Sequence, residues 1–180
     1  DLHADWGGDV KYGISKTLKA DFTYNTDFAQ VEADLQQVNL TRFSLFFPEK
    51  RDFFLENSGA FGFGAATGSD NAPALFYSRR IGLSRSQIVP ILAGGRLSGR
   101  VGRFSIGLLN MESDEQPAAG VPKTNFSVVR VKRDVLRRSS VGMIFTGRSV
   151  SEKGVGSNQA YGVDGQFLLT NVAVVNAFWA

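Results

Sequence analysis

The residues best suited to chemistry form a charged cluster that lies between two phenylalanine pairs, Phe46-Phe47 and Phe53-Phe54, and just after the second. Its members are Glu49, Lys50, Arg51, Asp52 and Glu56. Two carboxylates at a suitable separation can hydrolyse a glycosidic bond, one acting as general acid and the other as base or nucleophile. The alternative is an ion-pair network, in which Lys50 and Arg51 neutralise carboxylates that are partly buried. We expect the network, and therefore assign no catalytic residue.

Arginines elsewhere in the chain could bind anions. Arg79 and Arg80 lie in a segment that reads as a strand, where successive side chains point to opposite faces. We therefore expect one of them to face the inside of the fold and the other an interface or a partner. These arginines and Arg130 could instead balance carboxylates such as Asp164 and Glu32. The sequence leaves both alternatives open.

The composition argues against metals, cofactors and nucleic acid. The chain has no cysteine and one histidine, His3, which leaves neither a thiolate site nor a His-rich zinc site. The carboxylates of Glu112, Asp114 and Glu115 lack the spacing of a dedicated calcium loop. The net charge is +3, and the lysines and arginines are scattered along the chain. We therefore expect no metal, no cofactor and no nucleic-acid partner.

Most of the chain reads as short strands in which apolar and polar side chains alternate. The expected strands are residues 9–15, 17–25, 74–82, 88–98, 104–109, 126–133, 141–146, 161–168 and 172–179. Pro90 is expected to place the start of its strand at an edge or a bulge, because proline cannot donate to a ladder. The pattern predicts an all-β fold of antiparallel strands.

The predicted connections alternate between short turns and long polar loops. The long loops are expected at residues 112–124 and 148–159. This alternation is typical of an outer-membrane barrel. No apolar run of about 18 residues is present, whereas a barrel strand needs only about 9–11 residues that are apolar on alternate positions. A soluble barrel or sandwich would show the same pattern, with its apolar face against a core instead of lipid.

The segment 26–57 interrupts the strand rhythm. Asp34 and Gln37 have the spacing of a capping box, which favours a short helix, although the apolar residues that follow fit a strand equally well. We expect residues 34–52 to form an inserted helical or plug-like element inside a barrel or at its rim, because irregular backbone cannot face lipid. The next two stretches are expected to be a strand start and a loop: residues 53–56 and 57–71.

Six blocks of the sequence carry a family resemblance: DFAQVEAD (27–34), VNLTRF (38–43), FFPEKR (46–51), FFLE (53–56), LFYSRRIG (75–82) and SVVRVKRD (127–134). They resemble a family of bacterial outer-membrane β-barrel proteins of unassigned function. The barrel of that family usually follows a domain similar to family 9 carbohydrate-binding modules. The FFPEKR block is fairly specific, and Asp52 stands where the family pattern is expected to have proline. The resemblance implies a location in the bacterial outer membrane and a link to polysaccharide through a domain that this chain does not contain.

Together these observations predict an all-β chain of antiparallel strands that forms part of an outer-membrane β-barrel. Residues 1–180 are expected to be a single region and a piece of a larger chain. The expected function is that of a pore, anchor or assembly platform in contact with outer-membrane lipid. The alternatives are a membrane-associated hydrolase that uses Glu49, Asp52 and Glu56, and a soluble β-sandwich binding module. The candidate binding residues are Arg42, Glu49, Lys50, Arg51, Asp52, Glu56, Arg79 and Arg80.

Overall fold

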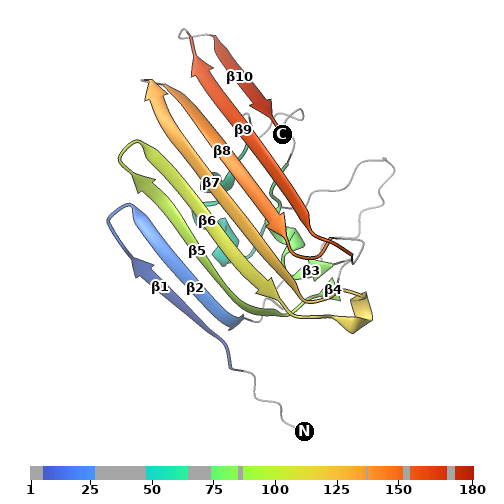
Figure 1. The fold of residues 1–180 in the computed structure, drawn as a ribbon. Helices are drawn as coiled ribbons and strands as arrows, with labels where there is room; N and C mark the ends of the chain where they lie inside the picture. Colours follow the sequence, from blue (N-terminus) through green and yellow to red (C-terminus); the bar gives the residue numbers. More distant parts are fainter. Residues whose placement is uncertain are drawn as a thin grey trace.

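One open antiparallel sheet forms the body of the protein (Figure 1). The structure, a computed structural model, describes residues 6–26, 48–64, 74–84, 87–136, 138–151, 155–169 and 173–180. The eight strands of the sheet are β1 (Gly8–Gly13), β2 (Leu18–Thr26), β5 (Ile91–Val101), β6 (Phe104–Ser113), β7 (Thr124–Leu136), β8 (Ser139–Arg148), β9 (Asn158–Leu168) and β10 (Val174–Trp179). They lie in this order, with β1 and β10 at the edges. The predicted all-β antiparallel fold is confirmed, and the described sheet is open, not closed into a barrel.

Short and long connections alternate along the sheet, as the sequence predicted. The turn between β5 and β6 is residues 102–103, whereas the loop between β6 and β7 is residues 114–123 and contains the 3-10 turn η3 (Pro117–Ala119). Another long loop, residues 149–157, joins β8 to β9. In an antiparallel meander successive connections lie at opposite ends, and every second connection lies at the same end. The two long loops therefore share one end of the sheet (Figure 1).

Two stretches between β2 and β5 lie on one face of the sheet (Figure 1). They are residues 48–64 and 74–84, and we call them together the inner segment. They contain α1 (Asp52–Leu55), the 3-10 turns η1 (Ser58–Phe61) and η2 (Ser78–Arg80), and β3 (Leu83–Ser84), which pairs with β4 (Gln87–Ile88). The face of the sheet that they cover is called the inner face, and the opposite one the outer face. No helix in the described ranges is long and apolar enough to cross a membrane.

The inner segment differs from three sequence predictions. Residues 53–56 were expected to begin a strand, but they lie in α1 and at its end. Residues 74–82 were also expected to be a strand, and they contain η2. Within residues 74–82, the backbone carbonyls of Ser78 and Ile81 accept hydrogen bonds from Arg51, whereas carbonyls in the sheet bind neighbouring strands. The helix expected at 34–52 lies mostly outside the described residues, and the helix that is present begins only at Asp52.

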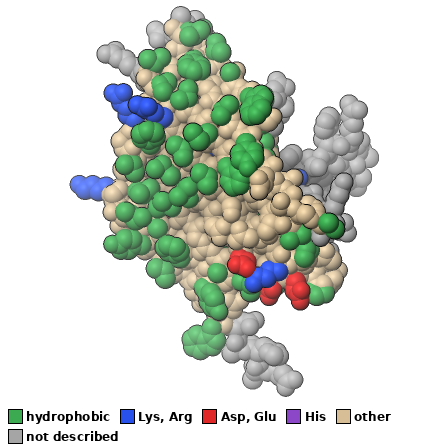
Figure 2. All heavy atoms as spheres, viewed as in Figure 1, with side chains coloured by type: hydrophobic (Ala, Val, Ile, Leu, Met, Phe, Trp, Pro, Cys, Tyr) green, Lys and Arg blue, Asp and Glu red, His purple; other side chains and the backbone are tan. Residues whose placement is uncertain are grey.

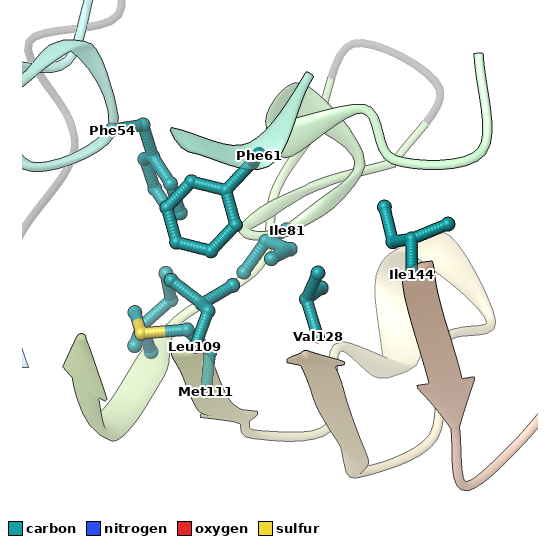
Figure 3. Packing of buried hydrophobic residues seen from close by; sticks show 8 residues of the cluster. Phe54, Phe61, Ile81, Leu109, Met111, Val128 and Ile144 are labelled. Carbon is teal, nitrogen blue, oxygen red and sulfur yellow. The ribbon is translucent and has the colours of Figure 1, made fainter. Parts of the chain in front are cut away.

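A small hydrophobic core joins the inner segment to the sheet (Figure 3). Its buried members are Phe54, Phe61 and Ile81 from the inner segment and Ile91, Leu109, Met111, Val128 and Ile144 from the strands. Met111 fits against β5 because Gly94 has no Cβ, and an added Cβ there would overlap the Met111 sulfur. Full burial of one such side chain contributes about 1.5–3 kcal/mol. The core therefore holds the charged residues of the inner segment close to those of the sheet.

Candidate functional site

Three of the four arginines that are buried in the described ranges, Arg51, Arg96 and Arg130, bind backbone carbonyls of the inner segment. Arg96 comes from β5 and Arg130 from β7, both on the inner face, and Arg51 directly precedes α1. A buried charge is costly unless it is paired and hydrogen-bonded. Each of the three has a carboxylate partner and also donates to backbone carbonyls of the inner segment. We call these three clusters the arginine anchors.

The first anchor joins the two stretches of the inner segment to each other. Arg51 binds Glu49 through two contacts, from Nε to Oε1 and from Nη2 to Oε2, both 2.8 Å. It also donates to the carbonyls of Ile81 at 2.5 Å and Ser78 at 2.9 Å. The Ser78 hydroxyl donates to Glu49 at 2.5 Å, and Arg79 donates to the Pro48 carbonyl at 2.9 Å. The predicted Glu49–Arg51 pair is therefore present, and it fastens residues 48–51 to residues 78–81.

The second anchor joins α1 to β2 and β5. Arg96 pairs with Asp21, which lies opposite it in the register, with an Nε to Oδ2 distance of 3.1 Å. Arg96 also donates to the carbonyls of Phe53 and Glu56, the latter at 2.5 Å. It thereby satisfies carbonyls at the end of α1 that have no partner within the helix. The Glu56 carboxylate binds Lys11 and Lys19, both at 2.9 Å.

The third anchor joins residues 62–64 to β7 and β9. Arg130 and Asp164 form a two-pronged pair, with Nη1 to Oδ1 at 2.6 Å and Nη2 to Oδ2 at 2.8 Å. Arg130 Nε donates to the Gly62 carbonyl at 2.9 Å, and the Gly64 amide donates to Asp164 at 3.2 Å. The sequence left open whether Arg130 pairs with a carboxylate such as Asp164, and the structure contains this ion pair.

The electrostatics of Glu49 and Glu56 bear on the general-acid role that hydrolysis of a glycosidic bond requires. Burial raises the pKa of Glu49, but hydrogen bonds from Arg51 and Ser78 outweigh it and bring the pKa from 4.5 to about 2. Hydrogen bonds from Lys19 and Lys11 lower the pKa of Glu56 from 4.5 to about 2. The general acid of a glycosidase needs a raised pKa so that it holds a proton to donate. Both glutamates are ionised at neutral pH, so neither suits that role.

The predicted site residues fall into separate places. Glu49, Arg51 and Arg79 belong to the first anchor, and Glu56 joins the lysines of β1 and β2, which the sequence had not linked to it. The remaining described candidates are exposed: Lys50, Asp52 and Arg80. Arg42 lies outside the described residues. Arg79 is buried and Arg80 exposed, but in a 3-10 turn and not by alternation along a strand. Among the described residues no group of three or more His, Cys, Asp or Glu could hold a metal ion.

Sequence reasoning missed the Asp21–Arg96 pair. A signal was present, because Asp21 alternates with Ala20 and Phe22 and therefore had to point away from the apolar face. What the sequence lacked was the register that sets Asp21 opposite Arg96, 75 residues further on.

The outer face of the sheet is apolar and exposed. Figure 2 shows hydrophobic side chains spread across the sheet, with charged side chains toward the margins. The large exposed apolar residues that the register places on this face include Val10, Tyr12, Phe22, Tyr24, Val129, Val141, Met143, Tyr161, Val163 and Trp179. The alternation thus buries the charged face and exposes the apolar one.

The fold and the anchors define an all-β protein with an open antiparallel sheet, an ion-paired inner segment on one face and an apolar surface on the other. Residues 1–93, just over half of the chain, match the family described as "Domain of unknown function (DUF5916)". The chain belongs to this family. The match extends from before β1 into β5 and includes the whole inner segment. Comparisons with curated proteins and with solved structures found no match.

Proposed function

We propose that this chain forms part of the wall of a β-barrel in the bacterial outer membrane. In this proposal the outer face contacts lipid and the inner segment lies inside the barrel, fastened by the arginine anchors. The role is non-enzymatic, that of a pore, an anchor or an assembly platform. One observation carries the proposal: the sheet covers its charged face and exposes its apolar face.

That arrangement is the reverse of what water favours. In a sheet with one face in water, the apolar side chains are the ones that become buried. Here Arg96 and Arg130 are each 2% exposed, whereas Tyr24 is 67% and Met143 60% exposed. Large exposed apolar surfaces mark contacts with a partner or a membrane. Alternation of apolar-outward and polar-inward residues supports lipid as the contact.

Several polar residues of the outer face support the same proposal, because they lie on β6 and β7 at the end with the long loops. Asn110 Nδ2 donates to Asn125 at 3.0 Å and to Ser127 at 2.8 Å. Lys123 binds Glu112 at 2.9 Å nearby. A lipid-facing band needs such a boundary where the strands reach the headgroups.

The proposal also bears on the edges of the sheet. Backbone groups at an open edge cannot face hydrocarbon, since each unsatisfied group there costs several kcal/mol. In the membrane the outer backbone groups of β1 and β10 would therefore be paired, with each other or with further strands. The link to polysaccharide that the resemblance implies stays a prediction. For the hydrolase alternative, the low pKa values of Glu49 and Glu56 make neither of them a suitable general acid.

The test is heat-modifiability on a detergent gel, applied to the longest native chain that contains this region. The protein is purified in a non-ionic detergent and run with and without boiling. We expect the unboiled protein to migrate differently from the boiled one, and to float with lipid vesicles on a density gradient.

Two outcomes would contradict the proposal: absence of a mobility shift, or a monomer that stays soluble and folded without detergent. The second outcome would favour the soluble β-sandwich, in which a further protein layer covers the outer face.

A further inference from the structure

A groove of about 620 Å³ lies on the outer face, near the end of the sheet with the short turns. Its mainly apolar walls come from β6 to β10 and include Phe104, Val131, Met143, Phe167 and Trp179. Arg133 also lines the groove, and the register places it on the outer face between Phe104 and Val141. Asp164 contributes to the lining as well, but its carboxylate lies on the inner face, paired with Arg130.

We propose that this groove binds an anionic phospholipid, with an acyl chain along its apolar walls and the phosphate against Arg133. The inference rests on the proposed location of the outer face in a membrane, and it adds the class of lipid and the place where that lipid binds. A phospholipid of this class joins an apolar chain to a negative headgroup. The groove joins an apolar surface to one outward-facing cation among its lining residues, so the two are complementary.

The placement of Arg133 is the first argument. Its guanidinium carbon lies 5.4 Å from the centre of the Phe104 ring, which holds the exposed side chain beside the groove. Within the described ranges no carboxylate forms an ion pair with Arg133, since the neighbouring Asp134 binds Arg100. The planar fork of arginine matches the oxygens of a phosphate group. Phe104 is the first residue of β6, so this pair lies where a membrane strand reaches the headgroups.

The charge of the short-turn end is the second argument. Three further exposed cations lie in the short turns at this end: Lys16, Arg103 and Arg138. The opposite end of the sheet carries the carboxylates of Glu112, Asp114 and Glu115. Figure 2 shows this separation, with basic side chains at the upper left margin and acidic ones at the lower right. Clustered lysines and arginines beside a membrane attract anionic headgroups, so the short-turn end favours an anionic lipid over a neutral one.

The experiment is quenching of tryptophan fluorescence by brominated lipids, on the longest native chain that contains this region, inserted into vesicles. Trp179 lines the groove and is 69% exposed, so a brominated acyl chain bound there quenches it. The difference between the wild type and Trp179→Phe isolates its signal. The vesicles contain equal amounts of phosphatidylglycerol and phosphatidylcholine, and one of the two is brominated in each measurement. We expect Trp179 to report an affinity for phosphatidylglycerol at least about fivefold higher, because one basic side chain near an anionic lipid contributes about that factor.

Variants assign the preference to Arg133. Arg133→Gln is expected to bring the two affinities to within about twofold of each other. Lys132→Gln is the matched control, because it removes one positive charge from the adjacent position, whose side chain points to the inner face. It should keep the preference of the wild type. Arg133 is exposed, and a heat-dependent mobility shift of each variant shows that it still folds.

The outcomes separate this inference from the proposed function. In an inserted and heat-modifiable protein, equal quenching by the two lipids would overturn the inference alone. A preference that Arg133→Gln retains, or that Lys132→Gln loses to the same extent, would do so too. Trp179 that neither lipid quenches in such a protein would show that another protein covers the groove. Failure to insert, with no mobility shift on heating, would overturn the proposed function and this inference with it.

Discussion

Arg130 and Asp164 form their ion pair across an intervening strand, directly over Gly142 of β8. Asp164 lies opposite Gly142 in the register, and Arg130 reaches it from β7. A Cβ added at Gly142 would lie 2.6 Å from Arg130 Nη1 and 2.9 Å from Asp164 Oδ1. The missing side chain is therefore what lets strands that are not neighbours share a buried ion pair.

The first prediction concerns this glycine. Gly142→Val should destabilise the protein by about 3–5 kcal/mol, the usual effect of breaking a buried pair. The measurement is the midpoint of urea unfolding followed by tryptophan fluorescence. Gly8→Ala is the control, because a Cβ at that strand position meets nothing within 4 Å. An equal, small effect of both substitutions would show that the pair tolerates a side chain beneath it.

The second prediction concerns Arg96 as the residue that holds α1 on the sheet. Arg96→Gln leaves Asp21 without its charged partner and removes the donor to the carbonyls of Phe53 and Glu56. Limited proteolysis should then cut within residues 48–64 at least about tenfold faster, because local opening exposes that backbone. Arg100→Gln is the matched control, since Arg100 forms an exposed pair with Asp134. Unchanged cleavage of the Arg96 variant would rule out the anchoring role.

The third prediction is a pH dependence carried by Glu49. Its pKa is about 2 in the folded protein, below the ordinary 4.5, because Arg51 and Ser78 hold the ionised form against the opposing effect of burial. Because folding lowers this pKa, ionised Glu49 adds to the free energy of unfolding. Its contribution is fully present above about pH 4.5 and is lost as the pH falls toward about 2.

Glu49→Gln should remove this contribution, so the variant is less stable at neutral pH and loses less stability on acidification. Urea unfolding at several pH values between about 5 and about 2 measures both effects. Glu115→Gln, in the exposed β6–β7 loop, controls for the loss of one negative charge. Parallel pH profiles for wild type and Glu49→Gln would contradict the assignment.

The fourth prediction distinguishes lipid from water at the outer face. Met143 is 60% exposed and lies in the middle of β8. Against lipid, Met143→Arg should cost about 2–4 kcal/mol and reduce folding into detergent or vesicles. Against water, the same change would be close to neutral and would improve solubility. Met143→Leu is the control, because it preserves volume and polarity. Normal yield of a heat-modifiable Met143→Arg barrel would contradict a lipid-facing position.

The strands were the part of the fold that sequence reasoning could reach. Alternation of side chains follows from the local geometry of an extended chain, so a run such as 104–109 identifies β6 without knowledge of any distant residue. The same alternation sorts residues into two faces. The alternation cannot predict which face of the sheet is covered, because the covered face is the one on which the inner segment packs.

The inner segment was predicted poorly for the same reason. Residues 53–56 and 74–82 have apolar patterns that fit a strand, yet their apolar side chains pack into the core on the inner face and they form no strand of the sheet. The conformation of the segment depends on side chains far away in the sequence, such as Arg96, which binds the carbonyls at the end of α1.

By itself, the amino-acid sequence determined that this protein is built of antiparallel strands with one apolar and one polar face. The tertiary structure alone decided that the polar face is the covered one, and that Arg51, Arg96 and Arg130 fasten the covering segment. The physical reason is the range of the forces involved. Strand periodicity is set within a few residues, whereas a buried ion pair forms only after the register of the sheet has brought distant residues together.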